Sequence, residues 1–402
     1  MNRATSLEVS SEEQIPKPGT RVGRLSRSLI REVANSAMGR ADVLPFWFGE
    51  SDQPTPHFIR EAAISSLRAG ETFYTENLGR SYLRQAISTY LSDLHERAIG
   101  VDRIAVTASG NSALMLASQL VVEHGDRVVT VTPLWPNAVE IPKIVGGQVT
   151  CVPLDVQEGE WALPLEKLLQ ALVPGTRMLV LNSPNNPTGW TIHQEEQRVI
   201  LDHCRRYGIW ILADDVYERL IYKDGLRSAP SFLELSEEQD RLIVVNSFSK
   251  AWCMTGWRIG WMVCPPAIVP DLAPLLEYNV SCVAEFSQRA GTVALEQGES
   301  YVSQMQEELG NTKRALMAAL RKLPRLEVPE ADGAMYLFLR VAGQNDSFRL
   351  AKQLIDEVGL GLAPGRAFGP EGEGWLRWCY AASWQKNELG VERFDRFLSR
   401  ER

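Results

Sequence analysis

Lys250 is the residue of this sequence whose surroundings most favour covalent chemistry. Ser247 and Ser249 precede it, Arg258 follows it, and tryptophans and glycines fill the gap. The apolar run 242–246 predicts a strand that ends just before the lysine. Most lysines are solvated surface charges. A lysine among apolar groups and near a second cation, however, loses proton affinity and becomes a nucleophile toward aldehydes near neutral pH.

The stretch around Lys250 resembles the lysine motif of the fold-type I pyridoxal-phosphate enzymes, and most closely that of the class I/II aminotransferases. The family pattern is Ser-x-Ser-Lys followed by Gly-x-Arg, and it is matched by Ser247, Ser249, Lys250, Gly256 and Arg258. The resemblance implies that Lys250 forms a Schiff base with pyridoxal 5'-phosphate, while Ser247 and Arg258 hold its phosphate. It extends over 24–397, nearly the whole chain.

Strand-like and helix-like segments alternate through the first two thirds of the chain. Strands are expected at 103–107, 127–131, 148–153, 177–182, 209–213, 242–246 and 259–263, and helices at 83–94, 111–122 and 194–207. This alternation predicts an α/β fold with a mainly parallel sheet covered on both faces. The resemblance implies a sheet of the seven-stranded type in a large cofactor domain. Ligands of such sheets bind beyond the carboxyl ends of the strands, so a site is expected in the loops found there.

Three of these loops contain candidate cofactor-binding residues. Ser109, Gly110 and Asn111 open a helix, where free N–H groups and the helix dipole suit a phosphate, although a plain N-cap is the alternative. Trp135 follows another strand and is suited to stack on a planar ring, a core tryptophan being the alternative. Asn186 lies in an Asn-Pro-Thr-Gly turn typical of the family, and the resemblance implies that it reaches the cofactor's phenolic oxygen.

Asp214 ends the expected strand 209–213. A carboxylate at the end of a buried strand needs a partner, and a protonated pyridine nitrogen fits that need. Asp214 would keep this nitrogen charged and the ring an electron sink, and Tyr217, three residues later, would bond the phenolic oxygen. Asp215 stands where the family more often has Glu or Pro.

The remaining candidates concern substrate and a second chain. Arg377 stands in an aromatic and apolar run, and it matches a family Gly-x-x-Arg that binds the substrate α-carboxylate; a buried salt bridge is the alternative. Gly49 ends a short buried strand expected at 43–48 and is a candidate wall of the substrate site. The resemblance implies that Tyr74 reaches the cofactor phosphate of the opposite subunit in a homodimer with shared sites. An ordinary half-buried aromatic is the alternative.

Three regions are expected along the chain. Residues 1–23 form a polar N-terminal arm without the apolar core of a signal peptide. Residues 53–296 form the large pyridoxal-phosphate domain. Residues 24–52 and 297–402 combine into a smaller α+β domain, with a long helix at 302–323 leading into it.

Composition excludes several classes of protein. The 402 residues are 45% hydrophobic, carry a net charge of −8 and include no basic block, which disfavours nucleic-acid partners and anionic membranes. No apolar run is long enough for a transmembrane helix. The six cysteines are scattered and the histidines form no metal-binding spacing, so we expect no metal and a reducing cytoplasm.

The predicted activity is transfer of an amino group between an L-amino acid and a 2-oxo acid by a ping-pong mechanism, with Lys250, Asp214 and Tyr217 as catalytic residues. A lyase, decarboxylase or synthase of the same fold would share these residues. A non-catalytic ligand-binding regulator is disfavoured because no DNA-binding segment is appended and the lysine is retained.

The side chain of the substrate is less well indicated. Bacterial aspartate aminotransferases that resemble this chain often have a lysine that reads an acidic side chain, and the matching residue here is Asn111. Together with Trp47, Trp135 and Trp252, this favours neutral or aromatic amino acids.

Overall fold

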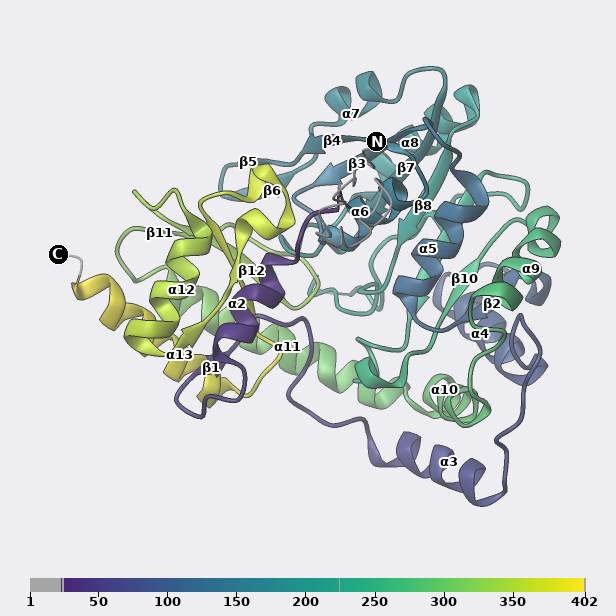
Figure 1. The fold of residues 1–402 in the computed structure, drawn as a ribbon, viewed down its shortest axis with the longest axis horizontal. Coiled ribbons are helices and arrows are strands. Elements are labelled where there is room, and N and C mark those ends of the chain that lie inside the picture. The colour runs from purple at the N-terminus through teal and green to yellow at the C-terminus, as the bar shows by residue number, and fades with distance from the viewer. Residues whose placement is uncertain (1–22, 24, 224, 401–402) are drawn as a thin grey trace, which may run out of the picture.

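The computed structural model describes residues 23, 25–223 and 225–400, so the expected arm lies outside the described residues apart from Gly23. Figure 1 shows a larger part built around a sheet and a smaller part that contains both the first and the last described elements. In the described part of the chain, no helix is long and apolar enough to cross a membrane.

The larger part contains a seven-stranded sheet. From one edge to the other its strands are β2 (Ile104–Thr107), β10 (Gly260–Val263), β9 (Leu242–Ser247), β8 (Trp210–Asp214), β7 (Thr176–Asn182), β3 (Arg127–Thr132) and β4 (Gln148–Pro153). All neighbours pair in parallel except β10, which is antiparallel to both β2 and β9. The predicted α/β fold with a mainly parallel sheet is therefore confirmed.

Helices cover both faces of this sheet because its strands are apolar on both sides. Successive residues of a strand point to opposite faces, and Ile211 and Leu212 accordingly belong to two different hydrophobic clusters. The cluster of Leu212 includes residues of α5 (Gly110–Val121), α6 (Pro136–Ile144) and α9 (Val269–Asn279). The cluster of Ile211 includes residues of α3 (His57–Arg68), α4 (Ser81–Leu94), α7 (Leu165–Ala171), α8 (Gln194–Tyr207) and α10 (Glu285–Gln297).

The smaller part has an antiparallel sheet in the order β11 (Leu326–Glu327), β12 (Tyr336–Val341), β15 (Trp375–Cys379) and β14 (Ala363–Pro364). Its helices are α2 (Leu29–Ala37), α12 (Ser347–Val358) and α13 (Trp384–Arg400), and α11 (Glu299–Leu320) leads into it from the larger part. A short hairpin, β5 (Asp155–Gln157) and β6 (Glu160–Ala162), contacts this smaller sheet through Trp161, whose ring centroid lies 4.9 Å from that of Trp375.

The first described segment and the C-terminal third of the chain meet in the smaller part. β1 (Leu44–Pro45) pairs in parallel with β13 (Leu360–Gly361), and α2 packs against α12 and β14. The strand expected at 43–48 is therefore real but only two residues long. This pairing agrees with the expected grouping of 24–52 with the C-terminal third, although the three-region division itself stays a prediction.

Candidate active site

A cavity of about 690 Å³ lies beyond the carboxyl ends of the central parallel strands. All the predicted catalytic, cofactor-binding and substrate-binding residues except Tyr74 line this cavity: Gly49, Ser109, Gly110, Asn111, Trp135, Asn186, Asp214, Tyr217, Ser247, Lys250, Arg258 and Arg377. Segments far apart in the sequence therefore converge on one hollow, as expected for loops at one edge of a parallel sheet.

Lys250 lies in the turn after β9, with its amine inside the cavity. Its Nζ donates a hydrogen bond to the backbone oxygen of Gly49 at 2.6 Å and lies 5.5 Å from the ring centroid of Tyr217. Burial lowers the pKa of Lys250 to about 8, and the positive charge of Arg377 acts in the same direction. About a tenth of such an amine is unprotonated at pH 7, and this is the form that attacks carbonyl carbons.

Asp214 is the last residue of β8, and its carboxyl group is 3% exposed. Its one hydrogen bond within the described residues is accepted by Oδ1 from the N–H of Val216 at 3.4 Å. Burial raises the pKa of Asp214 to about 7, and this N–H and the charge of Lys250 only partly oppose the rise. A buried carboxyl group without a close cation is costly to ionise, so the cavity is suited to a cationic ligand atom here.

Asn186, Tyr217 and Tyr336 form a buried chain of polar groups. The amide Nδ2 of Asn186 donates to the Tyr217 hydroxyl at 3.5 Å, and the hydroxyls of Tyr217 and Tyr336 are 2.7 Å apart. Burial raises the pKa of Tyr217 well above its usual value, so the hydroxyl keeps its proton. The pair formed by Asn186 and Tyr217 can therefore donate hydrogen bonds to an oxygen bound in the cavity.

Arg377 is buried between the rings of Tyr336 and Phe368, with its Cζ 4.5 and 4.9 Å from their centroids. One terminal nitrogen donates to Oδ1 of Asn186 at 2.8 Å, and the other donates to the backbone oxygen of Trp47. No carboxylate among the described residues forms an ion pair with this guanidinium, and its Nε is buried without a hydrogen-bond partner there. The salt-bridge alternative therefore finds no support, and the guanidinium is available to an anionic ligand.

An anion cradle forms where α5 begins. Ser109 caps the helix at φ 126°, and its Oγ accepts the N–H of Ser112 at 3.1 Å. Gly110 leaves room there, because a Cβ would lie 3.3 Å from the Cβ of Ser247, which is a tight contact. Arg258 lines the same cavity, with one terminal nitrogen donating to the backbone oxygen of Thr255 at 2.8 Å. N–H groups at a helix start, hydroxyls and a guanidinium together suit a phosphate.

Gly49 occupies a place where no side chain fits. A Cβ at this position would collide with the hydroxyl of Tyr336. The backbone of Gly49 can therefore approach Lys250 and Tyr336 together, which brings the loop after β1 against the site.

Comparison with known proteins identifies the family. A sequence model described as aminotransferase class I and II matches residues 41–394. The chain is 34% identical to an aspartate aminotransferase from Pyrococcus horikoshii, with 95% of this chain and 97% of that protein covered. The chain belongs to the class I and II aminotransferases. It transfers amino groups, and the lyase, decarboxylase, synthase and regulator alternatives are not favoured.

Solved structures of aminotransferases have the same fold. Thermus thermophilus aspartate aminotransferase with maleate matches with a TM-score of 0.89 at 27% identity, over 95% of this chain and all of that one. An aromatic aminotransferase from Pyrococcus horikoshii matches with a TM-score of 0.84 at 29% identity, over 92% of this chain and 99% of that one.

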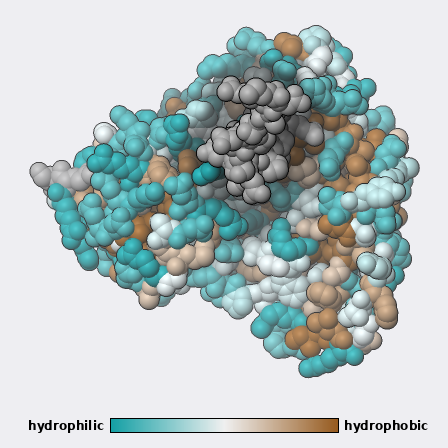
Figure 2. All heavy atoms as spheres, viewed as in Figure 1, coloured by the Kyte–Doolittle hydropathy of each residue, from teal (hydrophilic) through white to brown (hydrophobic). Residues whose placement is uncertain are grey.

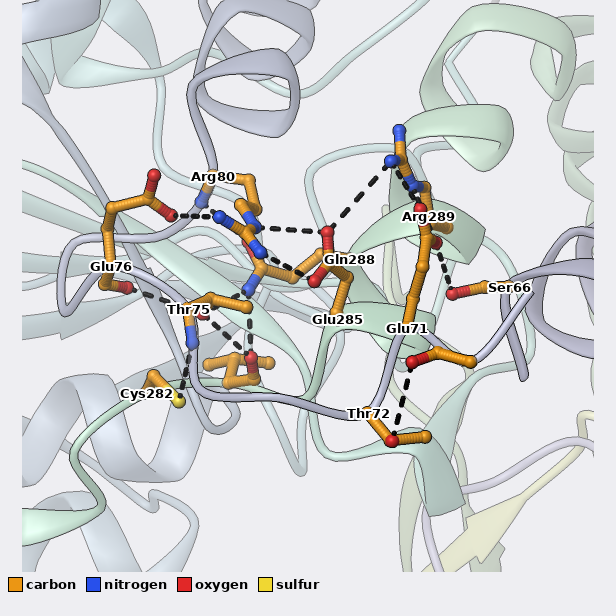
Figure 3. A network of polar contacts seen from close by, with 12 residues as sticks. Ser66, Glu71, Thr72, Thr75, Glu76, Arg80, Cys282, Glu285, Gln288 and Arg289 are labelled. Atoms are coloured by element: carbon orange, nitrogen blue, oxygen red, sulfur yellow. Dashed lines mark hydrogen bonds and ion pairs between the residues drawn. The ribbon is translucent and has the colours of Figure 1, made fainter. Parts of the chain in front are cut away.

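Tyr74 is the one predicted site residue of this aminotransferase that does not line the cavity of its own chain. Its side chain is 87% exposed, so the half-buried alternative is wrong for the single chain. The backbone next to it is nevertheless firmly held, as Figure 3 shows: the N–H of Thr75 donates to Sγ of Cys282 at 3.4 Å, and Nε2 of Gln288 donates to Oγ1 of Thr75 at 2.9 Å. The tyrosine is thus presented outward on a braced loop.

A second cavity of about 700 Å³ adjoins the first and shares Thr255 and Arg258 with it. Its other wall includes Cys282 and Val283, which are bonded to the loop that carries Tyr74. The end of the first cavity at Thr255 and Arg258 therefore adjoins residues that are hydrogen-bonded to the loop of Tyr74.

Two of the three tryptophans used to infer an aromatic substrate lie elsewhere. Trp252 is buried against Phe248 and Trp261, with ring centroids 5.3 and 6.3 Å away, and Trp47 is buried against Gly361. Neither lines the cavity, whereas Trp135 does. Trp47 and Trp252 therefore give no support to the prediction of neutral or aromatic substrates, and that use of them was wrong.

Three side chains that line the cavity or enclose the guanidinium of Arg377 were not predicted from the sequence. Tyr336 and Phe368 enclose Arg377, and Arg31 on α2 lines the wall. Tyr336 lies in β12, whose residues are almost all apolar and buried, and no motif marked it. Arg31 and Phe368 had no sequence signal.

Proposed function

We propose that this aminotransferase uses pyridoxal 5'-phosphate to move an amino group between an L-amino acid and a 2-oxo acid in a ping-pong cycle. The observation that carries the proposal is that a buried carboxyl group without a cationic partner, Asp214, and an amine of lowered pKa, Lys250, line the same cavity. A pyridinium nitrogen and an aldehyde carbon are the two groups that such a pair accommodates.

The other lining residues match the rest of the cofactor. Ser109, Gly110, Ser247 and Arg258 would hold the phosphate, and Asn111 stands at the same helix start. Asn186 and Tyr217 would donate to the phenolic oxygen, and Trp135 would stack on the ring. The N–H of Trp135 donates to the backbone oxygen of Asn186 at 2.9 Å, which joins the two loops that would grip the ring.

When bound, pyridoxal phosphate supplies an aldehyde for covalent attachment and a ring that withdraws electrons from the substrate Cα. Lys250 would hold the cofactor covalently at rest. Once substrate displaces its amine, Lys250 would take the proton from the substrate Cα and deliver it to the cofactor carbon C4′. Its pKa of about 8 suits both removal and return of a proton near neutral pH.

Arg377 would orient the substrate by binding its α-carboxylate. The guanidinium lies at the cavity wall with one nitrogen bonded to Asn186 and its Nε free of described partners. A bidentate grip would fix the Cα–H bond relative to the ring and so decide which bond of the substrate breaks. Gly49 would leave room for the substrate beside Lys250.

We further propose that the active unit is a homodimer in which Tyr74 of the partner subunit reaches the phosphate. Its exposure, the braced loop beneath it and the neighbouring cavity that shares Arg258 support this arrangement. Phe73 and Tyr278 are also strongly exposed, and Figure 2 shows apolar residues gathered at the lower right, where α3 lies in Figure 1. Such surface is normally covered by a partner.

We also propose a division of the chain into a large domain at 53–296 and a small domain from 24–52 and 297–402, and a cytoplasmic location.

Spectra of the cofactor-loaded protein with single amino acids test the activity. Transfer predicts conversion of the aldehyde form of the cofactor into the amine form, with release of one equivalent of 2-oxo acid, and reversal by a second 2-oxo acid. Release of ammonia or carbon dioxide in place of this exchange would identify a lyase or decarboxylase and contradict the proposal. A protein that shows no spectral change with any amino acid would contradict it as well.

A further inference from the structure

The wall of the cavity includes a helix from the smaller part of the molecule. Ser28, Ile30 and Arg31, at the start of α2, line the cavity. The segment before α2 also touches the opposite wall, because the N–H of Ser26 donates to a carboxylate oxygen of Glu140 on α6 at 3.3 Å. Figure 1 shows α2, in purple, among the elements of the smaller part, and α2 packs against α12 and β14 there. Arg31 therefore stands where the two parts close over the site.

Arg31 is a basic residue of the cavity wall that has no role in the proposed mechanism. The basic residues lining the cavity are Arg31, Lys250, Arg258 and Arg377, and the last three have proposed roles toward cofactor and α-carboxylate. No hydrogen bond or ion pair joins the Arg31 guanidinium to another described residue. The acidic residues nearest in sequence or contact are already engaged, since Glu32 pairs with Lys352 at 3.5 Å and Glu140 pairs with Lys143 at 2.8 Å.

The position of the guanidinium is set by an aromatic ring beside the catalytic lysine. The Cζ of Arg31 lies 5.4 Å from the ring centroid of Phe48, which also lines the cavity. Phe48 directly precedes Gly49, whose backbone oxygen accepts the hydrogen bond of Lys250. A substrate held at Lys250 thus has Arg31 within the same wall, on the side of Phe48.

A second donor lines the same cavity. The amide of Asn137 donates to Oδ1 of Asn111 at 2.9 Å, which leaves the Nδ2 of Asn111 without an acceptor among the described residues. Both asparagines line the cavity. Two carboxyl groups line this cavity: that of Glu50 accepts the hydroxyl of Thr255 at 3.2 Å, and that of Asp214 is buried at the end of β8, where it has a proposed role toward the cofactor nitrogen.

We propose that Arg31 binds the distal carboxylate of a dicarboxylic amino acid or of its 2-oxo acid, and so determines substrate specificity. The inference rests on the proposed function, because it assigns a substrate class to the same site. A guanidinium matches a carboxylate with two parallel hydrogen bonds, and it stacks on an aromatic ring without losing them. Arg31 on α2 would thus supply the positive charge for an acidic side chain that the neutral Asn111 does not supply.

The test compares Arg31→Gln with Arg27→Gln in the cofactor-loaded dimer. Arg27 is also exposed and basic and lies four residues earlier, but it does not line the cavity. The kcat/KM of each variant is measured for L-aspartate, L-glutamate, L-phenylalanine and L-alanine. Arg31→Gln should lower the values for the two acidic substrates by about 10- to 100-fold, mainly through KM, because a hydrogen-bonded charge is lost. The values for phenylalanine and alanine should stay within about two-fold, and Arg27→Gln should change none.

Binding of maleate, an unreactive dicarboxylate, gives a readout independent of turnover. Its Kd for the cofactor-loaded protein should rise by a similar factor in Arg31→Gln, and Arg31→Lys should restore part of the affinity. A wild-type protein that transaminates phenylalanine or alanine but neither acidic substrate overturns the role of Arg31 while leaving the proposed function intact. Equal losses on all four substrates, or unchanged maleate affinity, overturn it too. Failure of every amino acid to react contradicts the proposed function itself.

Discussion

At the scale of single residues, one physical cause gives the site its two reactive groups. Burial removes water from both Lys250 and Asp214, and this disfavours the charged form of each. The pKa of Lys250 accordingly falls to about 8, while that of Asp214 rises to about 7. Burying both groups without a partner costs stability, and a bound ligand with a cationic ring and an electrophilic carbon would reduce this cost.

This cost predicts a pH-dependent stability difference in the cofactor-free protein. The folded pKa of Asp214 lies above its ordinary value of 3.8, so its contribution to stability is complete below pH 3.8 and is lost as pH rises through about 7. Asp214→Asn carries no charge to bury. Its free energy of unfolding relative to wild type should therefore increase between pH 4 and pH 8, by about 2–4 kcal/mol.

Urea unfolding of both proteins at several pH values checks this expectation. Asp395→Asn, on the exposed side of α13, is the control and should show no such trend. Parallel pH curves for Asp214→Asn and wild type would mean that the carboxyl group is solvated or paired.

With cofactor present, the same Asp214→Asn protein should lose several orders of magnitude in turnover, because the charge it lacks is needed most in the transition state.

Arg377 gives a prediction that contrasts with the one for Arg31. Because every amino acid has an α-carboxylate, Arg377→Gln should lower kcat/KM by about 100-fold for acidic, aromatic and small substrates alike. Steady-state kinetics on the same four amino acids measures this. Circular dichroism and retained cofactor serve as the folding controls, since the residue is buried. Loss confined to one substrate class would place Arg377 at the side-chain end of the substrate.

Sequence reasoning found the residues on loops after the parallel strands, and the family motif also identified Arg377 on β15, but Tyr336 and Arg31 of the smaller part were missed. Asn186 and Asp214 follow strands whose direction alone brings their ends to one edge of the sheet. Tyr336 lies in an apolar strand where nothing distinguishes a core tyrosine from a lining one. Arg31 looks like any exposed helical arginine until α2 is placed over the cavity.

At the scale of elements, the loop that carries Tyr74 is held by buried polar contacts. The side chain of Gln288, which is fully buried on α10, accepts the N–H of Arg80 at 2.8 Å and donates to Thr75 and to the backbone oxygen of Val283. The guanidinium of Arg80 in turn bonds the carboxylate of Glu285 at 2.6 Å (Figure 3). One glutamine therefore joins both ends of the loop to α10.

Gln288→Ala should both lower the free energy of unfolding and increase the mobility of the loop that carries Tyr74. The change leaves the N–H of Arg80 without its partner, at about 1–3 kcal/mol if that group stays buried and unpaired, whereas the carbonyl of Val283 still accepts the hydroxyl of Thr75 at 3.2 Å. Urea unfolding measures the first effect, and loss of cofactor on dialysis measures the second. Gln304→Ala, on the exposed side of α11, is the matched control. Cofactor retention equal to wild type would show that this loop is not needed to hold the phosphate.

Several elements depart from simple sequence rules for physical reasons. The helices α6 and α9 contain Pro142 and Pro274, and no helix was predicted for either segment. Both are short and bury apolar residues, such as Ile141 and Leu272, in the sheet's core, so packing outweighs the lost backbone bond. The strand β1 is short, and its Pro45 is tolerated because the neighbouring N–H groups of Leu44 and Phe46 make the bonds to β13.

At the scale of the whole molecule, a shared site predicts complementation between two inactive chains. A Lys250→Ala chain lacks the reactive amine, and a Tyr74→Ala chain lacks the hydroxyl proposed for its neighbour's phosphate. A mixed dimer would contain one site with the lysine of the second chain and the tyrosine of the first, free of both changes. Activity should therefore appear after subunit exchange, up to about half that of wild type per mixed dimer, because one of its two sites is intact.

The control for complementation is each variant exchanged with itself, which should remain impaired. Mixed dimers are isolated through two affinity tags so that their formation is established independently of activity. Mixed dimers without recovered activity would contradict the shared site, and so would a fully active protein that sediments as a monomer.

The central claim is that Lys250 is the residue that carries the cofactor. Borohydride reduces the bond between a lysine and pyridoxal phosphate to a permanent one, so peptide mapping after reduction shows which lysine was attached. The account predicts a single pyridoxyl group, on the peptide that contains Lys250, and its absence after prior conversion of the cofactor by an amino acid. A pyridoxyl group on any other lysine, or none on an active cofactor-loaded protein, would contradict it.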